Sequence, residues 1–418
     1  MKLSSVFLAL SATVAHAQYS GDIVQYWVDQ SGLLSNNTLI GGLQSPPSGW
    51  FEAVVQAAIY VAALESKNES LAFQQLAVSH AAHDSLTWTF HGTRNFGNIF
   101  KSAQDILVKI NISESDDRYW RAAAIGRRAA VRVTNARQDD KLNNFVNYVY
   151  QPAYPGVYQR TPGSAFIAPD TPQARYLRTF GGIGDVTKFR APPPPSVNSS
   201  EYEAILNYVK AQGDRNSTVR TPYNTETAYF WRESSPIAWN RFAHNVIGSK
   251  YAKDVLSSAK FYAQLNYAHA NAAIAGWDSK AYYNTWRPVT AIRRTDIWLP
   301  SRRNVSVPTW TPLLDPTPNH QEYISTHATF GGAAAAVIKA WNGDKDAIDI
   351  VHSTNATGAG LGVVSRRYTS IKQAVKDNGD SRIYGGIHFQ FASDVGSVVG
   401  DAVGRATLEA FDKNWDKF

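Results

Sequence analysis

The chain of 418 residues carries a formal net charge of +7, with 44% hydrophobic residues, no cysteine and one methionine, at position 1. Without cysteine there are no disulfides, so a hydrophobic core must supply the stability. The basic residues are dispersed in isolated pairs and no nucleic-acid-binding motif accompanies them. These features argue against a nucleic-acid-binding protein.

The first 17 residues have the pattern of a secretory signal peptide. Lys2 precedes the apolar run 6–15, and Ala15-His16-Ala17 matches an A-x-A cleavage site. We expect a secreted chain that starts at Gln18, forms one domain over 18–418 and has no membrane-spanning helix. Seven Asn-x-Ser/Thr sequons predict a glycoprotein with exposed acceptors, at Asn36, Asn68, Asn111, Asn198, Asn216, Asn304 and Asn355.

Apolar residues recur at helical spacing through most of the chain, and strand signals are scarce. The residues around 259–274 are small or apolar on most sides, which predicts a central helix. Gly396, Gly400 and Gly404 recur every four residues and predict close helix packing. The expected fold class is all-α with long Pro-rich loops, and the predicted helical regions are 50–88, 117–136, 239–277, 328–341 and 388–411.

Three short segments in the C-terminal third carry polar residues that an apolar helical framework does not need. In the first, Lys280 and Arg287 stand seven residues apart. In a continuous helix both would project from one face, two turns apart. Two cations on one face suit a shared anion. A solvated basic face is the alternative for this segment alone.

The second segment places Ser325, Thr326 and His327 directly before an apolar helix. Backbone amides at a helix N-terminus attract anions, and a histidine there can act as an acid or a base. An ordinary N-cap serine beside a structural histidine is the alternative.

In the third segment, Arg382 precedes His388 by six residues, with Gly385 and Gly386 between them. A continuous helix would direct the two side chains to different sides. We therefore expect the glycines to break the helix, so that both side chains converge. The alternative is a glycine turn between helices with incidental polar residues.

Together the three segments resemble the signature of vanadium-dependent haloperoxidases and type 2 phosphatidic acid phosphatases, which reads K-x6-R-P, P-S-G-H and S-R-x5-H. The residues 263–280, 286–293 and 327–332 resemble the haloperoxidase branch. The resemblance implies a fold of helical bundles, with two four-helix bundles packed together. A mature chain without sulfur also fits a protein that works beside a strong oxidant.

The resemblance implies a haloperoxidase that uses hydrogen peroxide and bound vanadate to oxidise halide, with bromide favoured over chloride, for an organic acceptor. His388 would bind vanadium, His327 would serve as the acid–base group and Lys280 would polarise the peroxide. Trp277 and His320 match positions of the halide pocket. The expected vanadate-binding residues are Lys280, Arg287, Ser325, Thr326, Arg382 and His388.

Phosphate has the shape and charge of vanadate, so a secreted phosphate-ester hydrolase at the same site is the second interpretation. In that enzyme His388 would attack phosphorus and His327 would protonate the leaving group. A weakened or repurposed family member in secondary metabolism is the third. It rests on two departures from the signature: Thr326 stands where the family has glycine, and Ala392 replaces an aspartate that orients the metal-binding histidine.

Overall fold

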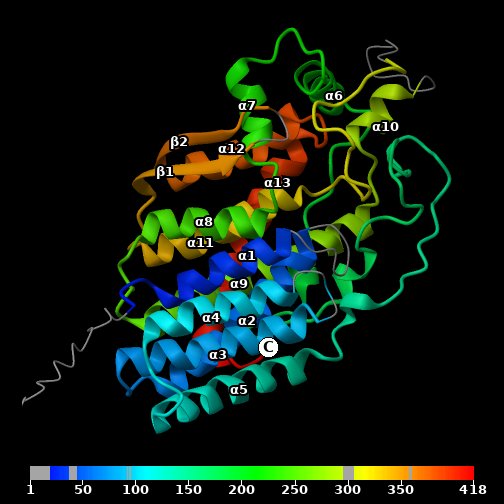
Figure 1. The fold of residues 1–418 in the computed structure, drawn as a ribbon. Coiled ribbons are helices and arrows are strands. Elements are labelled where there is room, and N and C mark those ends of the chain that lie inside the picture. The colour runs from blue at the N-terminus through cyan, green and yellow to red at the C-terminus, as the bar shows by residue number, and fades with distance from the viewer. Residues whose placement is uncertain (1–18, 37–44, 92, 94–95, 295–305, 357–359) are drawn as a thin grey trace, which may run out of the picture.

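The computed structural model describes residues 19–36, 45–91, 93, 96–294, 306–356 and 360–418, and over these residues the protein is largely helical (Figure 1). The predicted signal peptide, Gln18 and Asn304 lie outside the described residues. The N-terminal helices form one group, shown in blue to cyan-green, with bounds α1 Ile23–Asn36, α2 Ser45–Ser66, α3 Leu71–Thr89, α4 Phe96–Ile110 and α5 Asp117–Arg137.

The second group of helices comes from the C-terminal half of the chain. Its members are α8 Ser235–Ile247, α9 Val255–Tyr283, α11 Thr326–Trp341, α12 Ile371–Tyr384 and α13 Gln390–Asn414. Between and around the two groups lie α6 Ser200–Gln212, α7 Pro222–Phe230, α10 Pro288–Arg293 and the 3₁₀ turns Lys141–Asn143, Pro172–Tyr176 and Val186–Phe189. The all-α prediction is confirmed.

Two of the predicted helical regions are divided in the structure. The region 50–88 contains α2 and α3, which a turn at residues 67–70 separates. The region 239–277 contains α8 and α9, and Gly248 ends α8 with a positive φ of 58°. An L side chain rarely adopts such a φ, so glycine is suited to this helix end.

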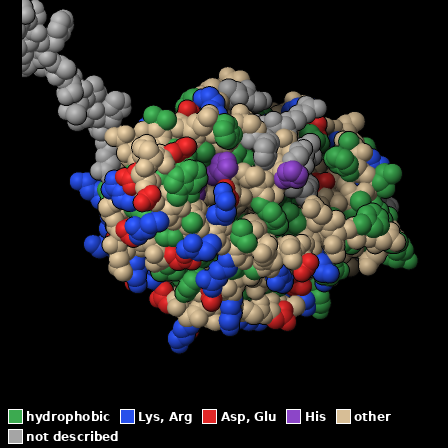
Figure 2. Space-filling model, turned by 60° about the horizontal axis from the view of Figure 1, so that its bottom comes forward, with side chains coloured by type: hydrophobic (Ala, Val, Ile, Leu, Met, Phe, Trp, Pro, Cys, Tyr) green, Lys and Arg blue, Asp and Glu red, His purple; other side chains and the backbone are tan. Residues whose placement is uncertain are grey.

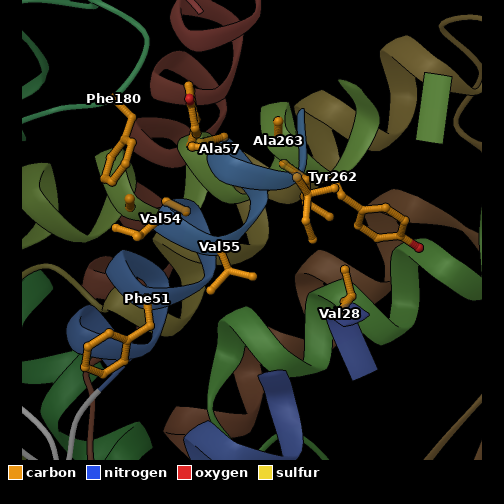
Figure 3. Close-up of a cluster of buried hydrophobic side chains, with 14 of the residues drawn as sticks. Val28, Phe51, Val54, Val55, Ala57, Phe180, Tyr262 and Ala263 are labelled. Carbon is orange, nitrogen blue, oxygen red and sulfur yellow. The ribbon is translucent and has the colours of Figure 1, made fainter. Parts of the chain in front are cut away.

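Helix α9 is central, as its composition predicts. Nearly all of its residues from Val255 to Lys280 are buried, including alanines on every side. Figure 3 shows Tyr262 and Ala263 of this helix in one apolar cluster with side chains of α2 such as Val54 and Ala57. The core is therefore continuous between the two groups of helices.

The glycine stripe of α13 allows it to approach α11 closely, as predicted. A β-carbon at Gly396 would lie 2.7 Å from the carbonyl oxygen of Ser325, and one at Gly404 would lie 2.7 Å from that of Ala333. A β-carbon at Gly400 would overlap the carbonyl of Thr329. The stripe thereby holds the N-terminus of α11, where Ser325 lies, directly against α13.

The sequence pattern did not predict one element, a two-stranded antiparallel hairpin of β1 (Ala347–Asn355) and β2 (Val363–Ser370). In β2 the buried side chains alternate with exposed ones, and Tyr368 and Arg366 face inward. Arg366 forms ion pairs with Glu226 and Asp377. Because Arg366 is polar, the sequence of β2 lacks the alternation of apolar and polar residues that identifies a half-buried strand.

Hydrogen bonds from the Pro-rich loops fix the segment before α11. The carbonyls of Ala191 and Pro192 accept hydrogen bonds from the hydroxyls of Tyr283 (2.6 Å) and Tyr323 (2.7 Å). In the other loop, Asn319 accepts from the Tyr158 hydroxyl (2.8 Å) and donates to the Ala168 carbonyl (2.9 Å). These bonds fix the segment from Asn319 to Tyr323.

Basic and acidic side chains are interspersed over the face shown in Figure 2, without a large patch of one sign. This distribution agrees with the dispersed basic pairs of the sequence. Within the described ranges, no helix combines the length and apolar character needed to cross a membrane.

Candidate active site

Lys280 and Arg287 do not share a helix, so the predicted reason for their proximity is wrong. Helix α9 ends at Tyr283, and Asn284 follows in the left-handed region with φ 48°. Arg287 has an extended backbone and is the N-cap of α10. The tight turn at Asn284, whose short polar side chain tolerates this conformation, brings Arg287 back to the end of α9.

Lys280 is fully buried on the last turn of α9. Its ammonium donates to the backbone carbonyls of Gln321 (2.8 Å) and Glu322 (3.0 Å). An ammonium has three donors, so these two bonds leave one N–H for a further acceptor.

Arg287, from the first polar segment, connects the third segment with His320 in the loop before α11. Its guanidinium donates to the backbone carbonyls of His320 (2.7 Å) and Ile387 (2.7 Å). Its Nη1 also lies 3.0 Å from Nε2 of His388, and its Nη2 lies 3.0 Å from Nδ1 of His320. The planar fork of arginine therefore holds both histidines in one buried site.

The glycine turn after α12 forms as predicted and brings the backbone of His388 back to Arg382. Helix α12 ends at Tyr384, and Gly386 has a φ of +75°. The turn returns the chain so that the amide of His388 lies 3.3 Å from the carbonyl of Arg382. The Arg382 Nη1 donates to the Trp231 carbonyl (2.7 Å), whereas its buried Nε has no partner among the described residues.

Ser325 is the N-cap of α11, as expected, but its hydroxyl does not cap the helix. The Ser325 Oγ is buried and has no hydrogen-bond partner within the described part of the chain. The first amides of α11 also lack acceptors inside the helix. This helix end therefore presents a hydroxyl and backbone N–H groups that an anion can satisfy.

The side chain of Thr326 does not strain this helix end. Thr326 has helical backbone geometry and is absent from the residues with positive φ. Its side chain is directed at Gly276 of α9 and is almost fully buried there. The first-turn amide of Thr326 is thus available in a normal helical conformation.

His388 has an orienting carboxylate, which corrects the expectation based on Ala392. The Nδ1 of His388 lies 2.9 Å from Oε1 of Glu322, and the same oxygen accepts from the amide of Phe389 (2.9 Å). Asp394, the other carboxylate near in sequence, is exposed and bonded to Gln390. Sequence reasoning missed Glu322. The available signal was that it is the one charged residue between Asp315 and Lys339.

His327 is partly exposed, unlike the other residues of the site. Its Nε2 lies 3.2 Å from the Glu233 carbonyl, which can only accept, so Nε2 carries the proton and Nδ1 keeps its lone pair. Burial and the nearby Arg382 lower the pKa of His327 well below its usual value. The ring is therefore neutral near pH 7 and able to accept a proton.

Trp277 and His320, the predicted halide-pocket residues, lie together. Their ring centroids are 5.0 Å apart, and the Lys280 ammonium is 5.6 Å from the Trp277 ring centroid. Both side chains are buried. The pair therefore forms one wall of the site next to Lys280.

We call Lys280, Arg287, Ser325, Arg382 and His388 the oxyanion cage. Within the described ranges, none of its three cations forms an ion pair with a carboxylate. Burial lowers the pKa of Arg287 to about 10 and of Arg382 to about 9, and it lowers that of Lys280 well below its usual value. Burial also raises the pKa of Glu322 to about 7. The shifts of Lys280, Arg287 and Arg382 are those of cations buried without a paired carboxylate among the described residues, and a bound anion would stabilise their charged forms.

Comparison with known proteins finds similarity in the part of the chain that carries the site. Residues 260–417, which contain most of α9 and all of α10 to α13, match the family model of the VCPO second helical-bundle domain. The chain is 24% identical over 261 residues to the vanadium chloroperoxidase of Curvularia inaequalis. That match covers 47% of this chain and 42% of the relative, so the aligned region is less than half of either protein.

Solved structures extend the similarity of fold to nearly the whole chain. A bacterial vanadium-dependent iodoperoxidase superposes with a TM-score of 0.75 at 21% identity, covering 93% of this chain and 96% of that one. The holo-type of a bacterial vanadium-dependent chloroperoxidase gives a TM-score of 0.67 at 17% identity, covering 89% and 93%. The matched C-terminal bundle and the fold support a relationship of this chain to the vanadium haloperoxidase superfamily.

Proposed function

We propose that the protein binds vanadate in the oxyanion cage and oxidises halide with hydrogen peroxide, delivering hypohalous acid or its equivalent to an organic acceptor. The observation that carries the proposal is the burial of three cationic side chains in one site. Lys280, Arg287 and Arg382 have no carboxylate partner among the described residues. Buried cations are costly without a counter-charge, so the site favours a multiply charged anion.

The residues present fit such an anion. The unpaired Nε of Arg382, the unpaired hydroxyl of Ser325 and the third N–H of Lys280 are donors without acceptors. They would bind the oxygens of vanadate together with the first amides of α11. His388 would bind vanadium through Nε2. When bound, vanadate supplies an electrophilic centre that activates hydrogen peroxide without changing its own oxidation state.

The chain's own groups then have separate tasks. Fixed cations stabilise negative charge as it develops, and they need no reorganisation during the reaction. Lys280 donates its remaining N–H toward the reacting oxygen. His327, neutral and partly exposed, accepts a proton at Nδ1 and can exchange it with solvent.

We assign halide binding to the wall formed by Trp277 and His320, and we propose bromide rather than chloride as the halide. The preference rests on the resemblance of position 320, a histidine here, to bromide-oxidising members of the family. The ring contact of 5.0 Å beside Lys280 supports a halide position near the cage.

Bromination tests the proposal directly. The protein is incubated with vanadate, hydrogen peroxide and bromide while bromination of a phenol dye is followed, and hydrolysis of a phosphate ester is measured without vanadate. We expect bromination that requires vanadate and that phosphate inhibits competitively. Ester hydrolysis blocked by vanadate, with no bromination, would instead identify the phosphatase.

A pair of arginine variants shows whether the cage performs the reaction. Arg287→Lys keeps the charge but loses the planar fork, so bromination should fall about ten- to hundredfold. Arg366→Lys is the matched control, because Arg366 is also a buried arginine but pairs with Glu226 in the hairpin region. Equal loss of activity in both variants would contradict a specific role of the cage.

We also propose that the chain is secreted and glycosylated. The support is the pattern of residues 1–17 and the exposure of five sequon asparagines, Asn68, Asn111, Asn198, Asn216 and Asn355. Expression in a secreting eukaryotic host should yield a protein that begins at Gln18 and loses mass on endoglycosidase treatment. An intact N-terminus and an unchanged mass would contradict this.

A further inference from the structure

Glu322 is a fully buried carboxylate at the back of His388. Its Oε1 lies 2.9 Å from the Nδ1 of His388 and also accepts from the amide of Phe389, while its Oε2 has no partner among the described residues. Its backbone carbonyl accepts from Lys280 (3.0 Å). One residue therefore contacts the imidazole, the start of the segment leading into α13 and the lysine of the cage.

The contacts of His388 determine which ring nitrogen carries the proton. Arg287 can only donate, so the Nε2 atom 3.0 Å from its Nη1 must accept. The proton then resides on Nδ1, where a carboxylate oxygen of Glu322 accepts it. Burial and the surrounding cations lower the pKa of His388 well below its usual value, which is consistent with a neutral ring. The lone pair of Nε2 thus faces Arg287 and the interior of the cage.

We propose that Glu322 is the positioning residue of His388: it holds the Nδ1–H tautomer and the ring orientation that make Nε2 available to the bound anion. This inference rests on the proposed vanadate site. The carboxylate that contacts His388 comes from the segment before α11. Position 392, four residues after His388, carries only the methyl group of alanine. The same short segment, from His320 to His327, thereby supplies a halide-pocket ring, the positioning carboxylate, the Ser325 hydroxyl and the acid–base histidine.

Loss of such a hydrogen-bonded partner behind a metal-binding histidine typically weakens metal affinity about 10–100-fold. Glu322→Ala should therefore weaken vanadate binding by this factor. Glu322→Gln keeps an oxygen that can accept from Nδ1–H, so it should recover most of the affinity. A vanadate affinity that falls in the order wild type, Glu322→Gln, Glu322→Ala would indicate positioning through a hydrogen bond. If only the charge of Glu322 mattered, Glu322→Gln would weaken binding as much as Glu322→Ala.

The tautomer is measured in the free protein. Histidine labelled with ¹⁵N distinguishes protonated from unprotonated ring nitrogens, and the His388→Gln variant identifies the His388 signals. We expect Nδ1–H with an unprotonated Nε2 in wild type and in Glu322→Gln, and a mixture of tautomers in Glu322→Ala. If the Ala variant does not fold, Glu322→Leu, which fills the space without an acceptor, takes its place.

Vanadate and phosphate affinities are then measured by titration, with thermal unfolding as a check on folding. Glu52→Gln is the matched control, because Glu52 is another fully buried glutamate, bonded to Ser31 (2.5 Å) in the N-terminal helices and outside the cage. It should change stability but neither the His388 signals nor the vanadate affinity.

The two proposals fail in different ways. Absence of vanadate binding to the wild type would overturn the proposed function, while the tautomer measurement would still test Glu322. A wild-type His388 spectrum in Glu322→Ala, or in its Leu substitute, would overturn the assignment of Glu322, whatever the protein does with vanadate.

Discussion

Thr326 and Gly276 are matched to one another across the interface of α11 and α9. A β-carbon added at Gly276 would lie 2.6 Å from the Cγ2 of Thr326. The absence of a side chain at Gly276 therefore provides the space that the Thr326 side chain occupies. Gly276 lies next to Trp277 and one turn before Lys280, so this contact sets the distance between two walls of the site.

Gly276→Ala should destabilise the protein by about 1–3 kcal/mol, because the new methyl group overpacks a filled interface. It should also weaken vanadate binding by displacing the N-terminus of α11. The double variant Gly276→Ala/Thr326→Ala should recover both properties. Denaturant unfolding and vanadate titration measure them. Gly97→Ala, where an added β-carbon has nothing within 4 Å, is the control. Additive effects of the two substitutions would refute the pairing.

Ser325→Ala should separate stability from binding. The unpaired, buried hydroxyl is costly in the free protein, so its removal should stabilise the fold by about 1 kcal/mol. Anion binding should weaken about tenfold, since one hydrogen bond to a charged ligand is lost. Ser79→Ala is the matched control, because the Ser79 hydroxyl contacts Trp27 (3.1 Å) and the Gln75 carbonyl (2.7 Å). It should lose stability and retain binding. Destabilisation by Ser325→Ala would show that its hydroxyl has a structural partner.

Gly400→Ala should be among the most damaging single substitutions in α13. Its β-carbon would overlap the backbone carbonyl of Thr329, which cannot rotate away. We expect a loss of about 3 kcal/mol, at the upper end of overpacking effects, measured by denaturant unfolding. Val398→Ala, on the exposed side of the same helix, should stay within about 0.5 kcal/mol of wild type. A tolerated Gly400→Ala would mean that α11 and α13 are further apart than the structure has them.

His269 should make the stability depend on pH. It is fully buried on α9, neither ring nitrogen has a partner among the described residues, and burial lowers its pKa to about 3. A histidine in the unfolded chain titrates near 6.5, so the unfolded state binds the proton first as the pH falls. Stability is therefore retained above about pH 6.5 and lost below it, at about 1.4 kcal/mol per pH unit down to the folded pKa.

His269→Phe should reduce this slope between pH 6 and pH 4 by about that amount. The measurement is the free energy of unfolding in denaturant at several pH values. Leu265→Ile, a buried change on the same helix without a titratable group, should leave the slope unchanged. An unaltered slope in His269→Phe would show that the histidine reaches solvent or a partner.

The sequence alone determined the features that depend on local spacing. Apolar periodicity defined most helices, since one buried face requires it. The four-residue glycine stripe predicted that α13 packs closely against another helix, and Gly385-Gly386 predicted the turn that joins Arg382 to His388. The residue types of the cage were also readable, because cations and histidines are unexpected in an apolar third of the chain.

Only the tertiary structure decided how those residues meet. Lys280 and Arg287 approach through the turn at Asn284 rather than along one helix. Glu322, which lies 66 residues before His388, contacts that histidine in place of the expected aspartate. The absence of a side chain at Gly276 provides the space for Thr326. The inward-facing Arg366 of the hairpin pairs with carboxylates on other elements. Each is a contact between distant parts of the chain, and a spacing rule within one segment carries no information about it.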